Sequence, residues 1–177
     1  SLHDALPICT AGSVIVPLSE LTTSIIEQTC TPALVTAGAV VSALRALGVR
    51  RIAMGTPYLD FVNRREVTFL EKHGFTVTKY LGLELGKNQQ ERRCIGHVPP
   101  EAVYRMALEI DTPEAEAIFI SCANLATLDV IEEIEHALGK PVVSSRVGGI
   151  AEMICDGSGN PCPSRLSDPA GFKTVPF

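Results

Sequence analysis

Residues 117–145 read AIFISCANLATLDVIEEIEHALGKPVVSS, and this stretch decides the fold. The apolar run at 117–120 is typical of a buried strand, and it ends at the small and polar residues SCAN at 121–124. Apolar residues then recur at helical spacing, which predicts a helix over 125–138. Strand, tight turn and helix are therefore expected to follow one another here.

A second strand is predicted directly after this helix. Gly139 is placed to end the helix in a left-handed conformation, and Pro141 prevents its continuation. Residues 142–143 are apolar and begin the new strand. The stretch is therefore predicted to be a strand–helix–strand unit. Cys122 lies at the carboxyl end of its first strand, where open α/β sheets bind ligands.

Cys122 has two interpretations. A thiol at a helix N-terminus has a lowered pKa and reacts as thiolate, which is the chemistry of a catalytic cysteine. The alternative is a packing role, because free cysteine is among the most buried residue types. Ser121, Asn124 and Thr127 put polar groups around the thiol, and this favours the functional interpretation.

The same alternation of strands and helices extends through the preceding residues. A helix is predicted with Thr31 as its N-cap and Pro32 in its first turn, and Gly48 ends it. From residue 51 strands and helices are expected to alternate. A strand at 51–54 is followed by a helix from TPY to 73, a strand at 75–81 and a helix from 99 to 110, and then by the Cys122 strand, its helix and a last strand. Such alternation predicts a parallel sheet flanked by helices.

Three further segments have their own expected character. The helix after TPY is expected to bury its apolar side, which consists of Phe61, Val62, Val67, Phe69 and Leu70. Residues 82–98 are polar and aperiodic, so they are expected to form a long loop that is either functional or simply solvated surface. Residues 146–177 are rich in glycine and proline and are expected to be irregular.

Composition narrows the class of protein. A chain of 177 residues with 46% hydrophobic and 20% charged residues is ordinary for a globular protein. A net charge of -5 argues against nucleic acid or an anionic membrane as partner. No apolar run approaches the roughly 20 residues that cross a bilayer. The six cysteines show no CxxC spacing, so no metal site is expected and they are interpreted as reduced thiols of a cytoplasmic protein.

Three motifs carry a resemblance to a known family. The chain contains CTAGS at 9–13, TPY at 56–58 and SCANL at 121–125, the last followed by GKPVVSS. In these motifs it resembles the maleate cis-trans isomerase and arylmalonate decarboxylase branch of the aspartate/glutamate racemase superfamily. The resemblance implies a flavodoxin-like α/β sheet flanked by helices, as one fairly complete lobe of a two-lobed racemase-type fold.

The resemblance also implies how the chain is divided. Residues 1–8 have no periodicity and are interpreted as a non-native leader. Residues 9–30 would be a remnant of the first lobe, 31–145 the second α/β lobe, and 146–177 an irregular tail. The chain is therefore expected to be a fragment, with weak or no activity as it stands. Relatives often dimerise, so a homo-oligomer is a partner hypothesis.

The activity implied by the resemblance uses two thiols and no cofactor. Cys9 and Cys122 would face each other across a small carboxylic acid, as in an isomerase or racemase of a small dicarboxylate. An arylmalonate-type decarboxylase that uses Cys122 as proton donor is the alternative, although such enzymes have glycine where this chain has Cys9. A non-catalytic α/β binding domain, or an inactive fragment, is the third hypothesis.

Substrate binding would depend on donors aimed at the carboxylate. Proton transfer next to a carboxylate without a cofactor produces an unstable enediolate, which needs preorganised hydrogen-bond donors. Turns are expected to supply backbone N–H groups, and Tyr58 resembles a family tyrosine that binds a carboxylate; its alternative is an amphipathic tyrosine at a lobe surface. The expected binding residues are Thr10, Ser13, Tyr58, Asn88, Ala123 and Asn124.

Overall fold

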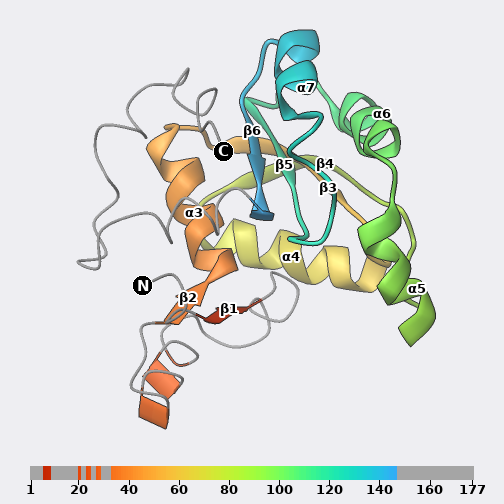
Figure 1. Cartoon of the computed structure of the whole chain (residues 1–177). Helices are drawn as coiled ribbons and strands as arrows, with labels where there is room; N and C mark the ends of the chain where they lie inside the picture. The colour runs from red at the N-terminus through yellow and green to blue at the C-terminus, as the bar shows by residue number, and fades with distance from the viewer. Residues whose placement is uncertain (1–5, 9–19, 21–22, 25–26, 29–32, 147–177) are drawn as a thin grey trace.

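The computed structural model describes residues 6–8, 20, 23–24, 27–28 and 33–146. Its centre is a parallel sheet of β3 (Arg51–Thr56), β4 (Thr76–Gly82), β5 (Ala117–Ile120) and β6 (Val142–Ser144). The strands lie in the order β4-β3-β5-β6 (Figure 1). The predicted parallel α/β fold is therefore confirmed.

Helices cover both faces of this sheet (Figure 1). On one face, α3 (Thr36–Ala46) and α4 (Asp60–Lys72) pack against β3 and β5. On the other face lie α6 (Pro100–Ile110) and α7 (Ile131–Leu138). Parallel strands need such crossover helices, which leave the sheet buried on both sides.

The core consists of two layers, one on each side of the sheet. Successive side chains of a strand point to opposite faces, so neighbours in β5 belong to different layers. Phe119 packs on the α3 and α4 side, whereas Ile118 and Ile120 pack on the α6 and α7 side. All three are at most 1% exposed, so strand β5 is fully enclosed.

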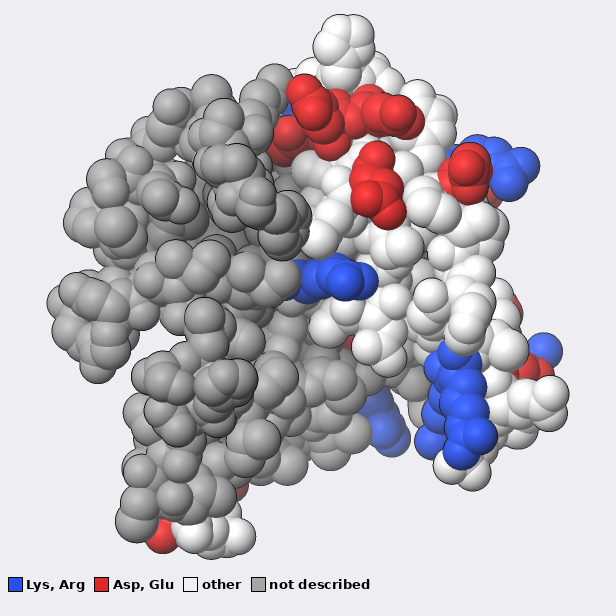
Figure 2. All heavy atoms as spheres, in the orientation of Figure 1, with Lys and Arg blue, Asp and Glu red and all other residues white. Residues whose placement is uncertain are grey.

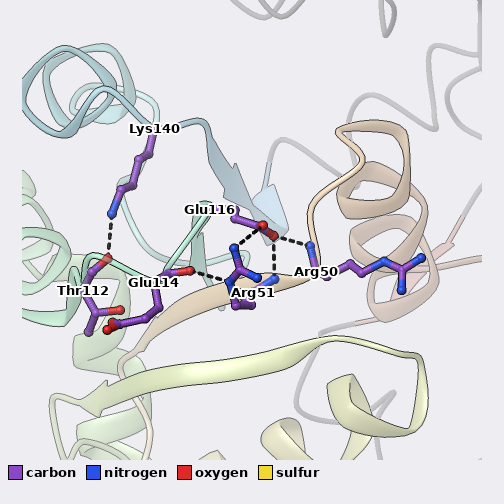
Figure 3. Close-up of polar contacts among 6 residues, drawn as sticks. All are labelled: Arg50, Arg51, Thr112, Glu114, Glu116 and Lys140. Atoms are coloured by element: carbon purple, nitrogen blue, oxygen red, sulfur yellow. Dashed lines mark hydrogen bonds and ion pairs between the residues drawn. The ribbon is translucent and has the colours of Figure 1, made fainter.

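The amino ends of the strands are joined by a polar cluster (Figure 3). One carboxylate oxygen of Glu116 accepts hydrogen bonds from the backbone N–H groups of Arg50 at 2.7 Å and Arg51 at 2.9 Å. Its other oxygen forms an ion pair with the Arg51 guanidinium at 2.7 Å. The backbone hydrogen bonds from Arg50 and Arg51 lower the pKa of Glu116. Glu116 directly precedes β5, so these contacts tie the start of β3 to the start of β5.

A second, two-stranded parallel sheet lies apart from the first. It pairs β1 (Leu6–Ile8) with β2 (Ala33–Val35). The predicted helix start at residues 31–32 is wrong, since 33–35 extend and α3 begins at Thr36. Pairing with β1 gives this backbone hydrogen-bond partners that compete with a helical turn. The described residues at 20, 23–24 and 27–28 are helical.

Two further predictions about local structure are wrong. The helix expected over 125–138 begins only at Ile131, and the residues before it form turns. The expected long loop at 82–98 contains α5 (Gln89–Cys94) and the 3₁₀-helix η2 (Ile95–His97). The left-handed end of α7 at Gly139 is as predicted, with φ 65°.

Charged side chains of opposite sign gather on different helices of the face in Figure 2. Acidic groups collect over α7, whose first turn carries Glu132 and Glu133. A basic group lies over α5, whose last turn carries Arg92 and Arg93. Among the described residues, no helix combines the length and apolar character needed to cross a membrane.

Candidate functional site

The candidate site lies at the carboxyl ends of β3 and β5, two neighbouring strands. The chain leaves β3 for α4 on one face of the sheet and leaves β5 for α7 on the other. In open α/β sheets, ligands bind beyond the strand ends where successive connections depart to opposite faces. Tyr58 follows β3 and Cys122 follows β5, so both flank this position.

Cys122 has an unusual backbone conformation. Its φ of 116° lies in the left-handed region that favours glycine, and Glu84 is the other described non-glycine residue with positive φ. Its N–H donates to the Ser145 Oγ at 3.3 Å, and its carbonyl accepts from the Leu125 N–H at 3.3 Å. Strained residues of this kind cost about 1–3 kcal/mol and cluster at functional sites.

Cys122 is buried, with 5% of the residue's surface exposed. Burial raises the pKa of its thiol, because the charged thiolate loses its solvation. A hydrogen bond from Tyr58 and the amides of Asn124 and Leu125 oppose that shift, and the charge of Glu66 adds to it. The expected lowered pKa is therefore wrong. Its premise was a helix N-terminus at Cys122, whereas α7 begins at Ile131.

Tyr58 is held in a turn with a complete set of hydrogen bonds. The Thr56 hydroxyl donates to Asn63 Oδ1 at 2.5 Å and accepts from the Tyr58 N–H at 3.0 Å. Asn63 Nδ2 in turn donates to the Tyr58 carbonyl at 3.3 Å. A Cβ on Gly82 would clash with both Asn63 Nδ2 and the Tyr58 carbonyl oxygen, so β4 packs tightly on this turn. The turn therefore presents Tyr58 in a fixed position.

The end of β6 supports the Cys122 loop from the other side. The hydroxyls of Thr127 and Ser144 are 2.8 Å apart, and both residues are fully buried. Ser144 Oγ also accepts from the Arg146 N–H at 3.1 Å. Thr127 therefore binds the Cys122 loop to β6.

Sequence reasoning missed Glu66, the most unusual buried group of this region. It was not among the residues expected on the buried side of α4, yet it is 1% exposed. Burial raises the pKa of Glu66 to about 7, and the nearby Ser121 hydroxyl counteracts this in part. Neither Glu66 carboxyl oxygen nor Ser121 Oγ completes a hydrogen bond of normal geometry within the described residues. No sequence pattern signals such a carboxyl on an amphipathic helix.

The apolar side expected for α4 is also wrong in part. Asn63, Glu66 and Leu70 are its buried residues. Phe61 is 57% exposed, with the Arg65 guanidinium 5.8 Å from its ring centroid. The inner face of α4 therefore carries the two polar groups nearest the site.

The structure brings together some of the predicted site residues. Tyr58, Cys122 and the backbone amide of Asn124 meet at the thiol, and Ala123 lies between the last two in sequence. Asn88 is exposed and serves as the N-cap of α5, accepting from the Glu91 N–H at 2.9 Å. Cys9, Thr10 and Ser13 lie outside the described residues, as does the tail from 147 onward. Within the described ranges, no group of three or more His, Cys, Asp or Glu residues could hold a metal ion.

Two relatives of known activity align with this chain. Arylmalonate decarboxylase from Bordetella bronchiseptica is 37% identical over 134 residues, which are 76% of this chain and 55% of the relative. Maleate isomerase from Nocardia farcinica (strain IFM 10152) is 35% identical over 119 residues, 67% of this chain and 46% of the relative. The chain thus spans about half the length of these relatives.

A solved structure matches the fold as well. It is a cysteine-to-serine mutant of the Nocardia farcinica maleate cis-trans isomerase with a covalently bound succinylcysteine intermediate. The match has a TM-score of 0.76 and 26% sequence identity, and it covers 85% of this chain and 63% of that one.

A family model covers most of the chain and includes every described element from β2 onward. The model is that of arylmalonate decarboxylase, and it matches residues 18–162. With this match, and with the two relatives above, the chain belongs to the arylmalonate decarboxylase family.

Proposed function

We propose that this chain is part of a cofactor-independent isomerase or racemase of a small dicarboxylate, similar to a maleate cis-trans isomerase. Cys9 and Cys122 act as a pair, with residues 9–30 from one lobe and 31–145 forming the other. The observation that carries the proposal is the buried Cys122 thiol at the carboxyl ends of the neighbouring strands β3 and β5. It is hydrogen-bonded to Tyr58 and to two backbone amides.

The raised pKa of Cys122 fits a proton donor. A thiol that stays protonated near neutral pH can give its proton to a carbanion, and the thiolate that remains is then stabilised by Tyr58 and the Asn124 and Leu125 amides. A nucleophile, by contrast, benefits from a lowered pKa. We therefore assign the donor role to Cys122 and the nucleophilic role to Cys9.

The proposed reaction runs through a covalent adduct. The Cys9 thiolate adds to one alkene carbon of maleate, and the electron pair of the double bond moves to the other carbon as an enediolate. Cys122 protonates that carbon, giving a succinyl thioether in which the central bond rotates freely. The Cys122 thiolate then removes a proton, and expulsion of the Cys9 thiolate gives fumarate. A succinylcysteine in the relative's structure supports an adduct of this type.

An assay of maleate isomerisation tests this proposal. Purified protein containing this chain is incubated with maleate, and fumarate is followed by proton NMR. Turnover is expected to be lost in Cys9→Ser and in Cys122→Ser and kept in Cys94→Ser, since Cys94 is an exposed cysteine outside the proposed pair. Turnover retained in Cys122→Ser would overturn the mechanism.

Decarboxylation is the second candidate, favoured by the 37% identity to an arylmalonate decarboxylase. In that reaction a malonate derivative loses carbon dioxide, and Cys122 protonates the resulting enediolate alone. Carbon dioxide release from an arylmalonate that persists in Cys9→Gly but not in Cys122→Ser would select this activity over isomerisation.

We also propose a setting for the protein. Catalysis by free thiols requires a reducing compartment, which makes the cytoplasm the expected location. The expected ligand is a small carboxylic acid, and a homo-oligomer is the expected assembly. Light scattering of the purified protein, with and without maleate, measures that assembly directly.

A further inference from the structure

Glu66 is a buried acid without a partner of opposite charge in the described part of the chain. It is 1% exposed, and both its carboxyl oxygens lack a hydrogen bond of normal geometry there. Its polar neighbour is Ser121, whose buried Oγ is likewise without such a bond. An ionised carboxylate in this position would lose its hydration with little compensation.

The position of Glu66 follows from the same face of α4 that holds the Tyr58 turn. Residues three apart on a helix are neighbours, so Glu66 lies one turn beyond Asn63. Asn63 contacts Thr56 and Tyr58 at the end of β3, and Glu66 contacts Ser121 at the end of β5. The inner face of α4 thus runs beneath both strands that flank the site.

Glu66 also acts on the neighbouring thiol. Its charge raises the pKa of Cys122, as expected for two groups that would both be negative. Tyr58 is the other titratable group beside the thiol, and it has the opposite effect. An ionised Glu66 would therefore oppose the thiolate that Tyr58 supports.

Among the described residues, no other charged group counteracts the effect of the Glu66 charge on the Cys122 thiol. On α4 itself, Arg64 and Arg65 are exposed, and Asp60 pairs with Arg64 and Tyr80. The buried residues of α3, which packs on the same face, are Thr36 and apolar side chains. Lys79 of β4 donates instead to the Glu109 carbonyl.

We propose that Glu66 is a positioning residue for Cys122: its buried carboxyl beside Ser121 is uncharged in acid, and once ionised it holds the thiol protonated, because two buried negative charges repel each other. It deepens the donor role given to Cys122 under the proposed function. Its tests read thiol and carboxyl ionisation and not turnover, so either idea can fail alone.

The first test compares alkylation of Cys122 by iodoacetamide from pH 6.5 to 10 in the parent chain, Glu66→Gln and Glu71→Gln. Peptide mass spectrometry reads Cys122, and the exposed Cys94 is the internal standard. Glu71→Gln is the matched control, because Glu71 lies on the same helix and is exposed. Above pH 8 the Glu66→Gln chain should react at least about twofold faster at Cys122, and the gain should vanish at the acid end of the range.

A gain independent of pH would indicate looser packing and would overturn the proposal, as would no gain at all.

The second test needs no substitution at Glu66. Cys122 is modified with iodoacetate, which leaves a permanent negative charge, or with iodoacetamide, which leaves none. The Glu66 carboxyl is then titrated by carbon-13 NMR. Its midpoint should be higher after iodoacetate, and equal midpoints would contradict the proposal.

Discussion

The Cys122 amide donates a hydrogen bond to the Ser145 side chain, with the nitrogen and Oγ 3.3 Å apart. This bond joins the strained turn after β5 to the residue that follows β6. Both residues are buried, so water cannot easily replace either partner. The conformation that presents the thiol is therefore held by the neighbouring strand as well as by its own sequence.

Replacing Ser145 with alanine is expected to destabilise the chain. The buried Cys122 N–H would lose its acceptor, which costs about 1–3 kcal/mol. Urea unfolding followed by circular dichroism measures the loss. Ser42→Ala is the control, because Ser42 is exposed on α3 and should change stability by less than about 0.5 kcal/mol. Equal stabilities for the two variants would contradict a structural role for this bond.

Replacing Cys122 tests the backbone strain directly. Glycine adopts a φ of 116° without penalty, whereas alanine retains the steric conflict of any residue with a Cβ. Both substitutions remove the buried sulfur, so the packing loss is similar. Cys122→Gly is therefore expected to be more stable than Cys122→Ala by about 1 kcal/mol or more. In ordinary strands the order is reversed, so an alanine variant that is the more stable would show that the turn is relaxed.

The pH dependence of stability should report Glu66. Its pKa is about 7 in the folded chain, against 4.5 for an ordinary glutamate. The folded state therefore binds the proton more tightly, and stability falls as pH rises from about 4.5 to about 7. The total loss is up to ~3 kcal/mol, from about 1.4 kcal/mol per pKa unit.

Glu66→Gln should remove this fall, because the amide does not titrate. The variant is expected to unfold at a higher urea concentration than the parent at pH 8 and to differ little from it near pH 4.5. The exposed Glu71→Gln variant should follow the parent at every pH. A parent chain whose stability does not fall between these pH values would show that Glu66 is not held protonated.

Much of the fold could be predicted because it depends on the spacing of apolar residues over short stretches of sequence. The apolar runs at β3 and β5, and the left-handed end at Gly139, are set by residues close in sequence. The start of α7 could not be predicted in the same way. Leu125 and Leu128 fit helical spacing. However, Leu125 is buried while lying in a turn, and Leu128 is 38% exposed. The turn before α7 is held instead by hydrogen bonds such as that between Thr127 and Ser144.

The candidate site was predicted at Cys122, Tyr58 and Asn124, but not on the inner face of α4. Cys122 and Tyr58 follow apolar strands, and that position in an α/β pattern is a local signal. Glu66 and Asn63 have no such signal, because polar residues on an amphipathic helix normally face solvent. Their burial depends on where α4 lies against β3 and β5, which is a tertiary property.

The last prediction concerns the close packing of β4 on the Tyr58 turn. A Cβ at position 82 would overlap the Tyr58 carbonyl oxygen and Asn63 Nδ2, so Gly82→Ala must displace a backbone group. We expect a loss of about 1–3 kcal/mol in the free energy of unfolding and a changed alkylation rate at Cys122, since Tyr58 bonds to its thiol.

Gly96→Ala is the matched control for Gly82→Ala. The nearest atom to its new Cβ would be the Asn124 carbonyl oxygen at 3.9 Å, an ordinary contact. It is expected to leave stability unchanged or to raise it by up to ~1 kcal/mol, because alanine restricts the unfolded chain. If Gly82→Ala were as stable as Gly96→Ala and alkylated Cys122 at the parent rate, the Tyr58 turn would not be fixed by β4. The hydrogen bond to the Cys122 thiol would then come from a tyrosine whose position is not fixed.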